Sequence, residues 1–120
     1  MIDGDTIEVE IQGNTYRVRY IGINTPELAH DGLPDELYSQ EATIKNQELV
    51  EGKIVRLEKD ISETDAYGRL LRYVCMGDLF VNAELVKLGY AQATPYPPDV
   101  KYESYFLSVE NEAKASQRGI

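Results

Sequence analysis

Residues 6–21 read TIEVEIQGNTYRVRYI, and this stretch decides the fold class. Apolar and charged residues alternate over Thr6–Ile11, and the alternation resumes over Thr15–Ile21 after a Gln-Gly-Asn turn. Such alternation is typical of a strand with one buried face. Two such strands around a Gly-Asn turn predict an antiparallel β-hairpin.

The rest of the chain predicts further strands and three helices. Strands are expected at 53–59, 69–76 and 79–80, and helices at 38–51, 81–88 and 101–118. Ser39 is a candidate N-cap and Gly52 a candidate stop for the first helix. The proline-rich residues 94–99 exclude a helix or a central strand. This order favours an α+β fold, and we expect a five-stranded OB-fold-like β-barrel with three helices.

The composition limits the kinds of site that the chain can build. Its 120 residues are enough for one core, so residues 1–120 are expected to form a single domain without a membrane span. One cysteine, Cys75, and one histidine, His30, leave no credible zinc site and no Ser-His-Asp triad of the usual kind. We expect Cys75 in the core and His30 in a solvated loop. Catalysis would therefore use carboxylates, arginines, lysines, tyrosines or a hard metal ion.

Two further expectations concern tyrosines and acidic residues. We expect Tyr16, Tyr20 and Tyr73 to pack in the barrel core and not to stack on bases. We expect the acidic loop 60–65 to be a solvated hairpin tip and not a second metal site.

Oxygen-bearing side chains occur at two points of the hairpin. Asp5 stands at the start of the first strand, and Asn24, Thr25 and Glu27 follow the second strand. Because both strands belong to one hairpin, these groups can converge on a Ca²⁺ ion, which takes carboxylate, amide and backbone oxygens. Each stretch also has a simpler interpretation. The first can be an Asp-Gly turn and the second the start of a helix, although residues 28–37 lack a helical pattern.

Two arginines add positive charge to this set. Arg19 lies on the second strand, and Arg69 opens another strand after the residues DAYG. Guanidinium groups bind phosphate oxygens bidentately, so arginines on neighbouring strands suit a phosphodiester. Each arginine alone is equally compatible with a surface ion pair to one of 21 acidic residues. The combination of a base, a metal site and two cations favours phosphodiester hydrolysis.

The stretches DGDT, RVRYIGINTPE and DAYGR, in this order and at these separations, resemble the staphylococcal nuclease (thermonuclease) family. The resemblance continues in VNAELVKLGYA and in the last helix, so it covers nearly the whole chain. It implies an OB-fold barrel with three helices. It also implies Ca²⁺-dependent cleavage of DNA and RNA at the 5′ P–O bond, which leaves 3′-phosphates.

The resemblance implies three metal-binding positions. Asp5 resembles the family's metal-binding aspartate, and Thr25 matches a threonine that offers its backbone carbonyl to the ion. Asn24 stands where the best-known members carry a second aspartate. An amide oxygen can still bind Ca²⁺, but one negative charge is lost, so we expect metal binding to be weaker by about ten- to a hundred-fold.

The resemblance also implies catalytic and substrate-binding residues. Glu27 matches the general base, and Arg19 and Arg69 match the two phosphate-binding arginines. Tyr67 matches a tyrosine that lines the nucleotide pocket. The family's further nucleotide-contacting tyrosines do not align cleanly with the stretch ATPYPPDVKY. Tyr96 is a candidate for one of them, and Tyr102 and Tyr105 can equally belong to the core side of the last helix.

Two features depart from this pattern at the level of the whole chain. The net charge is −9, whereas the best-known member is basic, so we expect weak binding, strong salt sensitivity and reliance on Arg17, Arg19 and Arg69. The family's first strand usually begins several residues before the Asp-Gly. We therefore expect that this strand is truncated here and that the chain was cut from a longer protein.

Three functions compete. The first is a nuclease acting on single-stranded DNA and RNA as a monomer, and a secreted or cell-envelope location is weakly favoured. The second is a non-catalytic module that binds nucleic acid or protein. The third is an acidic interaction domain, which only the net charge supports. The joint presence of Asp5, Arg19, Glu27 and Arg69 favours the enzyme.

Overall fold

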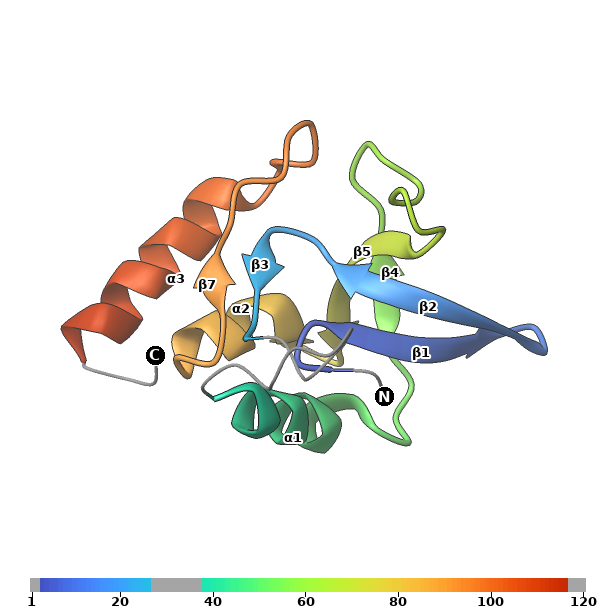
Figure 1. Ribbon diagram of the computed structural model, residues 1–120, viewed down its shortest axis with the longest axis horizontal. Coiled ribbons are helices and arrows are strands. Elements are labelled where there is room, and N and C mark those ends of the chain that lie inside the picture. Colours follow the sequence, from blue (N-terminus) through green and yellow to red (C-terminus); the bar gives the residue numbers. More distant parts are fainter. Residues whose placement is uncertain (1–2, 27–37, 117–120) are drawn as a thin grey trace, which may run out of the picture.

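The computed structural model describes residues 3–26 and 38–116, which form an α+β fold (Figure 1). A mixed five-stranded sheet has the order β1-β2-β5-β4, with β6 paired to β5. These strands are β1 (Thr6–Ile11), β2 (Asn14–Tyr20), β4 (Arg56–Glu58), β5 (Leu70–Met76) and β6 (Leu79–Phe80). The helices are α1 (Ser39–Val50), α2 (Val81–Lys87) and α3 (Glu103–Ala115). A curled sheet with three helices confirms the predicted OB-fold-like architecture.

The predicted hairpin is confirmed within one residue at each strand end. β1 and β2 pair in antiparallel fashion, with Thr6 opposite Arg19 and Ile7 opposite Val18. The turn between them uses left-handed backbone at Gln12 and Gly13, with φ of 51° and 85°. A two-residue turn of this kind matches the twist of the two strands. Its residues are Gln12 and Gly13, because Asn14 of the predicted Gln-Gly-Asn turn is already the first residue of β2.

The chain then pairs strands that lie far apart in the sequence. β2 runs parallel to β5, with Arg19 opposite Leu71. Parallel neighbours require a long crossover, and here α1 and β4 lie within it. A separate two-stranded ribbon joins β3 (Ile23–Asn24) to β7 (Gln92–Ala93), which the sequence pattern did not predict. Asn24, in β3, is thereby held against the segment before α3.

The core lies between the sheet and the helices. α2 packs against β5 and α3, and α1 packs against α2 (Figure 1). Tyr20 and Tyr73 are fully buried, as expected for core residues, and form part of one apolar cluster. Tyr16, also expected to pack in the core, is 38% exposed, because it lies towards the hairpin tip, where the strand is open to solvent. Cys75 is only partly buried.

The start of α1 differs from the prediction. The helix begins at Ser39, but the capping position is Tyr38, which has left-handed backbone with φ of 67°. Ser39 is therefore the first helical residue and not the N-cap, and its buried hydroxyl has no hydrogen-bond partner among the described residues. Beyond the helix, Gly52 adopts φ of 72°, in keeping with the predicted stop.

Strands β1 and β4 are the two edges of the sheet. β4 covers only Arg56–Glu58 of the strand expected at 53–59, and Ile54 is 95% exposed. A groove of about 340 Å³ lies between the edges and is lined by apolar side chains of both, including Val9 and Leu57. The site described next lies at the N-terminal end of β1, where Thr6 pairs with Arg19 near the end of β2.

Candidate active site

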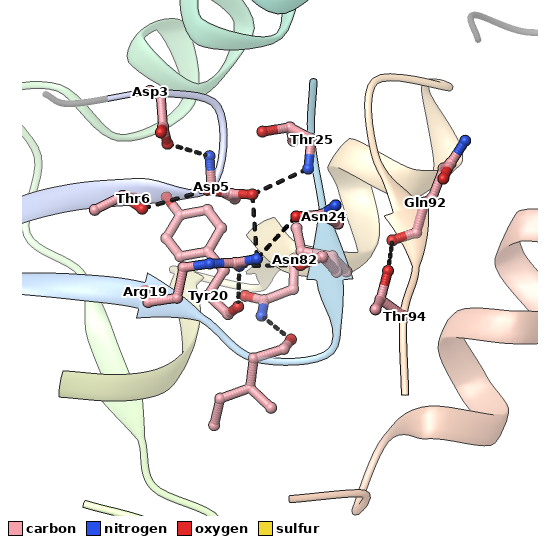
Figure 2. A network of polar contacts seen from close by, with 12 residues as sticks. Asp3, Asp5, Thr6, Arg19, Tyr20, Asn24, Thr25, Asn82, Gln92 and Thr94 are labelled. Atoms are coloured by element: carbon pink, nitrogen blue, oxygen red, sulfur yellow. Dashed lines mark hydrogen bonds and ion pairs between the residues drawn. The ribbon is translucent and has the colours of Figure 1, made fainter. Parts of the chain in front are cut away.

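The guanidinium of Arg19 joins the two predicted metal-binding side chains (Figure 2). Nη2 of Arg19 lies 3.1 Å from Oδ1 of Asn24 and 3.4 Å from Oδ2 of Asp5. Nη1 donates to the backbone carbonyls of Tyr20, at 2.6 Å, and Ile23, at 3.0 Å. The Arg19 side chain is thus fixed at the end of β2. Its Nη2 contacts both the carboxylate of Asp5 and the amide oxygen of Asn24.

Asp5 is 6% exposed and is held by three segments of the chain. Its Oδ2 accepts the backbone N–H of Thr25 at 3.0 Å, and its Oδ1 accepts the hydroxyl of Thr6 at 3.3 Å. Its backbone carbonyl accepts the N–H of Tyr20 at 2.9 Å. Figure 2 shows Asp5 between these groups. The start of β1, the end of β2 and the residue after β3 therefore converge on one carboxylate.

A second carboxylate lies beside Asp5. Oδ1 of Asp3 accepts the backbone N–H of Asp5 at 3.1 Å. Burial and then the negative charge of Asp5 raise the pKa of Asp3 to about 6, while Arg19 lowers it in part. Two carboxyls and one guanidinium leave a local excess of negative charge. Asp3 was not among the predicted site residues, although its place in the DGD triplet was a signal for it.

The oxygen donors at this point fit a hard cation. Carboxylate oxygens of Asp3 and Asp5 and the amide oxygen of Asn24 are ligands of the kind that Ca²⁺ takes. No cluster of three or more histidine, cysteine or acidic side chains with metal-site spacing occurs in residues 3–26 and 38–116. Two carboxyls and an amide are too few for a complete Ca²⁺ shell, so backbone oxygens, water or Glu27 would have to complete it. Glu27 lies outside the described residues, as does His30.

Gly4 is needed for the close packing around Asp5. A Cβ atom at Gly4 would lie 2.6 Å from the hydroxyl oxygen of Thr25 and 2.9 Å from Cβ of Ala42 in α1. Both distances are far below normal contact. The turn that carries Asp5 is therefore pressed between the Thr25 segment and α1, so the glycine of the Asp-Gly pair serves close approach as well as turning.

The stretch DAYGR forms a turn organised by Asp65. Oδ1 of Asp65 accepts the backbone N–H groups of Tyr67, at 2.9 Å, and Arg69, at 3.0 Å, while Oδ2 pairs with Nε of Arg69 at 2.6 Å. Gly68 closes the turn with φ of 79°. The loop 60–65 was expected to be a solvated hairpin tip. The Asp65 side chain is instead only 5% exposed and holds Arg69 in place.

The predicted cationic and aromatic residues occupy different surroundings. Arg69 directly precedes β5, the parallel neighbour of β2, so its backbone lies one strand away from that of Arg19. Tyr67 is 84% exposed and its ring centroid lies 5.5 Å from the Arg69 guanidinium carbon. Tyr96 is 37% exposed and lies in the loop before α3. The structure thus groups Tyr67 with Arg69, and Asp5 with Arg19 and Asn24.

Comparisons with known proteins match the sequence pattern. Residues 17–120 match the family described as "Staphylococcal nuclease homologue". The chain is 39% identical over 120 residues to the thermonuclease of Staphylococcus intermedius, covering all of this chain and 71% of that protein. It is 40% identical over 121 residues to the SPbeta prophage-derived endonuclease YokF of Bacillus subtilis (strain 168), covering 99% of this chain and 41% of that protein. Endonuclease YncB of the same organism is 39% identical, with 57% of its length covered.

None of the helices in the part of the chain that the structure describes is long and apolar enough to cross a bilayer.

Proposed function

We propose a specific reaction for this chain from the premise that it belongs to the staphylococcal nuclease family. Similar proteins are named thermonuclease and endonuclease, so its general function is that of a nuclease acting on nucleic acid. The proposed reaction is Ca²⁺-dependent hydrolysis of DNA and RNA at the 5′ P–O bond, which leaves 3′-phosphates. The observation that carries the proposal is the meeting of Asp5, Arg19 and Asn24 within 3.4 Å.

The metal site of the proposal consists of oxygen donors. Asp5, Asn24 and the backbone carbonyl of Thr25 would hold Ca²⁺, with Asp3 beside them. Once bound, Ca²⁺ would supply Lewis-acid polarisation of a phosphate oxygen. Asp5 supports this role because it is buried and fixed by hydrogen bonds, so it needs little rearrangement to act as a ligand.

Arg19 and Arg69 would bind the phosphate group. Both guanidiniums are positioned by acidic partners, Asp5 at 3.4 Å and Asp65 at 2.6 Å, and both remain partly exposed. Positive charge held in this way stabilises the negative charge that phosphorus gains in the transition state. Arg19 would exchange its contact with Asn24 for a phosphate oxygen, whereas Arg69 keeps its Nε on Asp65 and offers its outer nitrogens.

Glu27 would act as the general base. In the sequence it follows Thr25 by two residues, and a link of two residues can span at most about 7 Å. Glu27 would take a proton from a water whose oxygen attacks phosphorus. The bond from phosphorus to the 5′ oxygen then breaks, the 5′ oxygen takes a proton from a solvent water, and the phosphate stays on the 3′ oxygen. Tyr67, exposed beside Arg69, would stack on a base of single-stranded substrate.

Hydrolysis of single-stranded DNA at low salt, with Ca²⁺ or with a chelator, tests the proposal. Glu27→Gln should lower the Ca²⁺-dependent rate by about 10²–10⁴-fold, because a general base contributes that much. Glu112→Gln removes the same charge from an exposed position on α3 and should leave the rate unchanged. Product ends should carry 3′-phosphate, which a phosphatase specific for 3′ ends detects.

A non-catalytic binding module is the second candidate, and the amide at Asn24 is the observation in its favour. The two functions separate in the same experiment. If the folded chain binds single-stranded DNA but does not cleave it in Ca²⁺, the catalytic proposal is wrong and the binding module takes its place.

A further inference from the structure

Two hydrogen bonds, one buried and one partly buried, link α1 to the turn that carries Asp5. The Tyr20 hydroxyl donates to Oδ1 of Asn46 at 2.6 Å, and Nδ2 of Asn46 donates to the backbone carbonyl of Asp3 at 3.0 Å. Tyr20 is 1% exposed and Asn46 is fully buried. An amide in such a place costs free energy unless its hydrogen bonds are made, so its orientation is strongly specified.

The directions of these two hydrogen bonds fix the orientation of the Asn46 side-chain amide. The Tyr20 hydroxyl is the donor of the first bond, and Oδ1 of Asn46 accepts it at 2.6 Å. A donor at Oδ1 orients the amide with its NH₂ group towards Asp3. The Asp3 carbonyl belongs to the tight turn Asp3-Gly4-Asp5, two residues before the carboxylate that the proposed function places on the metal.

Tyr20 holds this turn at two points. Its backbone N–H donates to the Asp5 carbonyl at 2.9 Å, while its hydroxyl reaches the Asp3 carbonyl through Asn46. Gly4, between these two points, is pressed against Ala42 of the same helix. The turn is therefore hydrogen-bonded at Asp3 and at Asp5 and packs against α1 at Gly4. A shift of α1 or of Tyr20 would move Asp5.

We propose that Tyr20 and Asn46 are positioning residues for the metal site. They keep the Asp3-Gly4-Asp5 turn in the geometry that directs the Asp5 carboxylate towards Asn24 and Arg19. This inference rests on the proposed function, because it concerns a cation held by Asp5. Groups that orient metal ligands without touching the metal typically change metal affinity by about 10- to 100-fold when they are removed.

Calorimetric titration of the intact chain with Ca²⁺ tests this positioning role independently of activity. The main variant combines Tyr20→Phe with Asn46→Leu. It replaces both partners of the buried bond by apolar groups of similar size, which limits the loss of stability. Its dissociation constant for Ca²⁺ should rise by about tenfold or more, because the Asp3 carbonyl loses its donor.

A matched control is available in the same core. Tyr73 is also 1% exposed, and its hydroxyl donates to Oδ2 of Asp60 at 2.7 Å, away from the Asp5 turn. Tyr73→Phe removes the same kind of group and should lower the unfolding midpoint without changing the Ca²⁺ dissociation constant by more than about twofold. Tyr20→Phe alone should raise that constant by about threefold or more, because Asn46 keeps its bond to Asp3 but loses its fixed orientation.

The outcomes separate the positioning role from the proposed function. If the parent chain shows no saturable Ca²⁺ binding, both fail. If the parent binds Ca²⁺ but the folded double variant binds it within about twofold of the parent, only the positioning role is wrong. Should the double variant not fold, Tyr20→Phe decides, and a constant within about twofold of that of Tyr73→Phe overturns the inference.

Discussion

At the scale of single residues, Asn24 most directly controls the charge of the site. Its amide oxygen lies 3.1 Å from Nη2 of Arg19 and shares that nitrogen with Asp5. An amide is neutral, so the pair of Asp5 and Asn24 contributes one formal negative charge where a pair of carboxylates would contribute two. Metal affinity should respond to this difference, because ligand charge tunes Ca²⁺ binding.

Asn24→Asp should therefore tighten Ca²⁺ binding by about ten- to a hundred-fold. Calorimetric titration with Ca²⁺ measures the change. Asn111→Asp adds the same charge at an exposed position on α3 and should leave the affinity unchanged. An unaltered titration curve for Asn24→Asp would remove Asn24 from the metal site.

At the scale of elements, the turn before β5 depends on one buried carboxylate. Burial alone would raise the pKa of Asp65, but hydrogen bonds from the Arg69 and Tyr67 backbone and from the Arg69 side chain lower it below its usual value. A carboxyl with a lowered folded-state pKa stabilises the fold above its unfolded pKa of about 3.9. That stabilisation is lost as the pH falls through the folded-state pKa.

Asp65→Asn should lower the free energy of unfolding by about 1–2 kcal/mol at pH 7, because charged hydrogen bonds to Arg69 are lost. It should also weaken phosphate binding by releasing the guanidinium. Urea unfolding at pH 7 and at about pH 3 measures the first effect, and the difference from the parent should shrink at the lower pH. A difference that stays constant between the two pH values would show that the Asp65 charge is not its source.

At the scale of the whole molecule, a net charge of −9 opposes binding to a polyanion. Arg17 of β2 is one of the arginines expected to contact phosphate, and Glu8 of β1 stands directly opposite it. About three phosphate contacts to a single strand would give a slope near −2 when the logarithm of affinity is plotted against that of salt concentration. The charge near Arg17 should affect binding of nucleic acid more than the total charge of the chain does, because salt screens distant charges.

Glu8→Gln should therefore raise kcat/KM for single-stranded DNA at low salt by a few-fold, with a smaller gain at high salt. Glu112→Gln changes the net charge equally on α3 and should have little effect. Steady-state kinetics across a salt series measures both variants. Equal gains for the two variants would show that total charge controls binding, contrary to the expectation of local control.

The sequence by itself determined the elements whose signals are local. The alternation over 6–21 gave the hairpin because strand periodicity and turn chemistry act between near neighbours. The predicted ends of helices α2 and α3 differ from the observed ends by at most three residues, and β6 matched. The oxygen-bearing residues Asp5 and Asn24 indicated a shared site, since they flank the two strands of the hairpin in the sequence.

Only the tertiary structure decided the contacts between distant segments. The parallel pairing of β2 with β5 and the ribbon of β3 with β7 depend on how the whole chain packs. The same holds for Tyr20, which the sequence presented as a core residue, and for Asn46, which carried no signal at all. Their bond spans 26 residues and exists because folding buries two polar groups that must then satisfy each other.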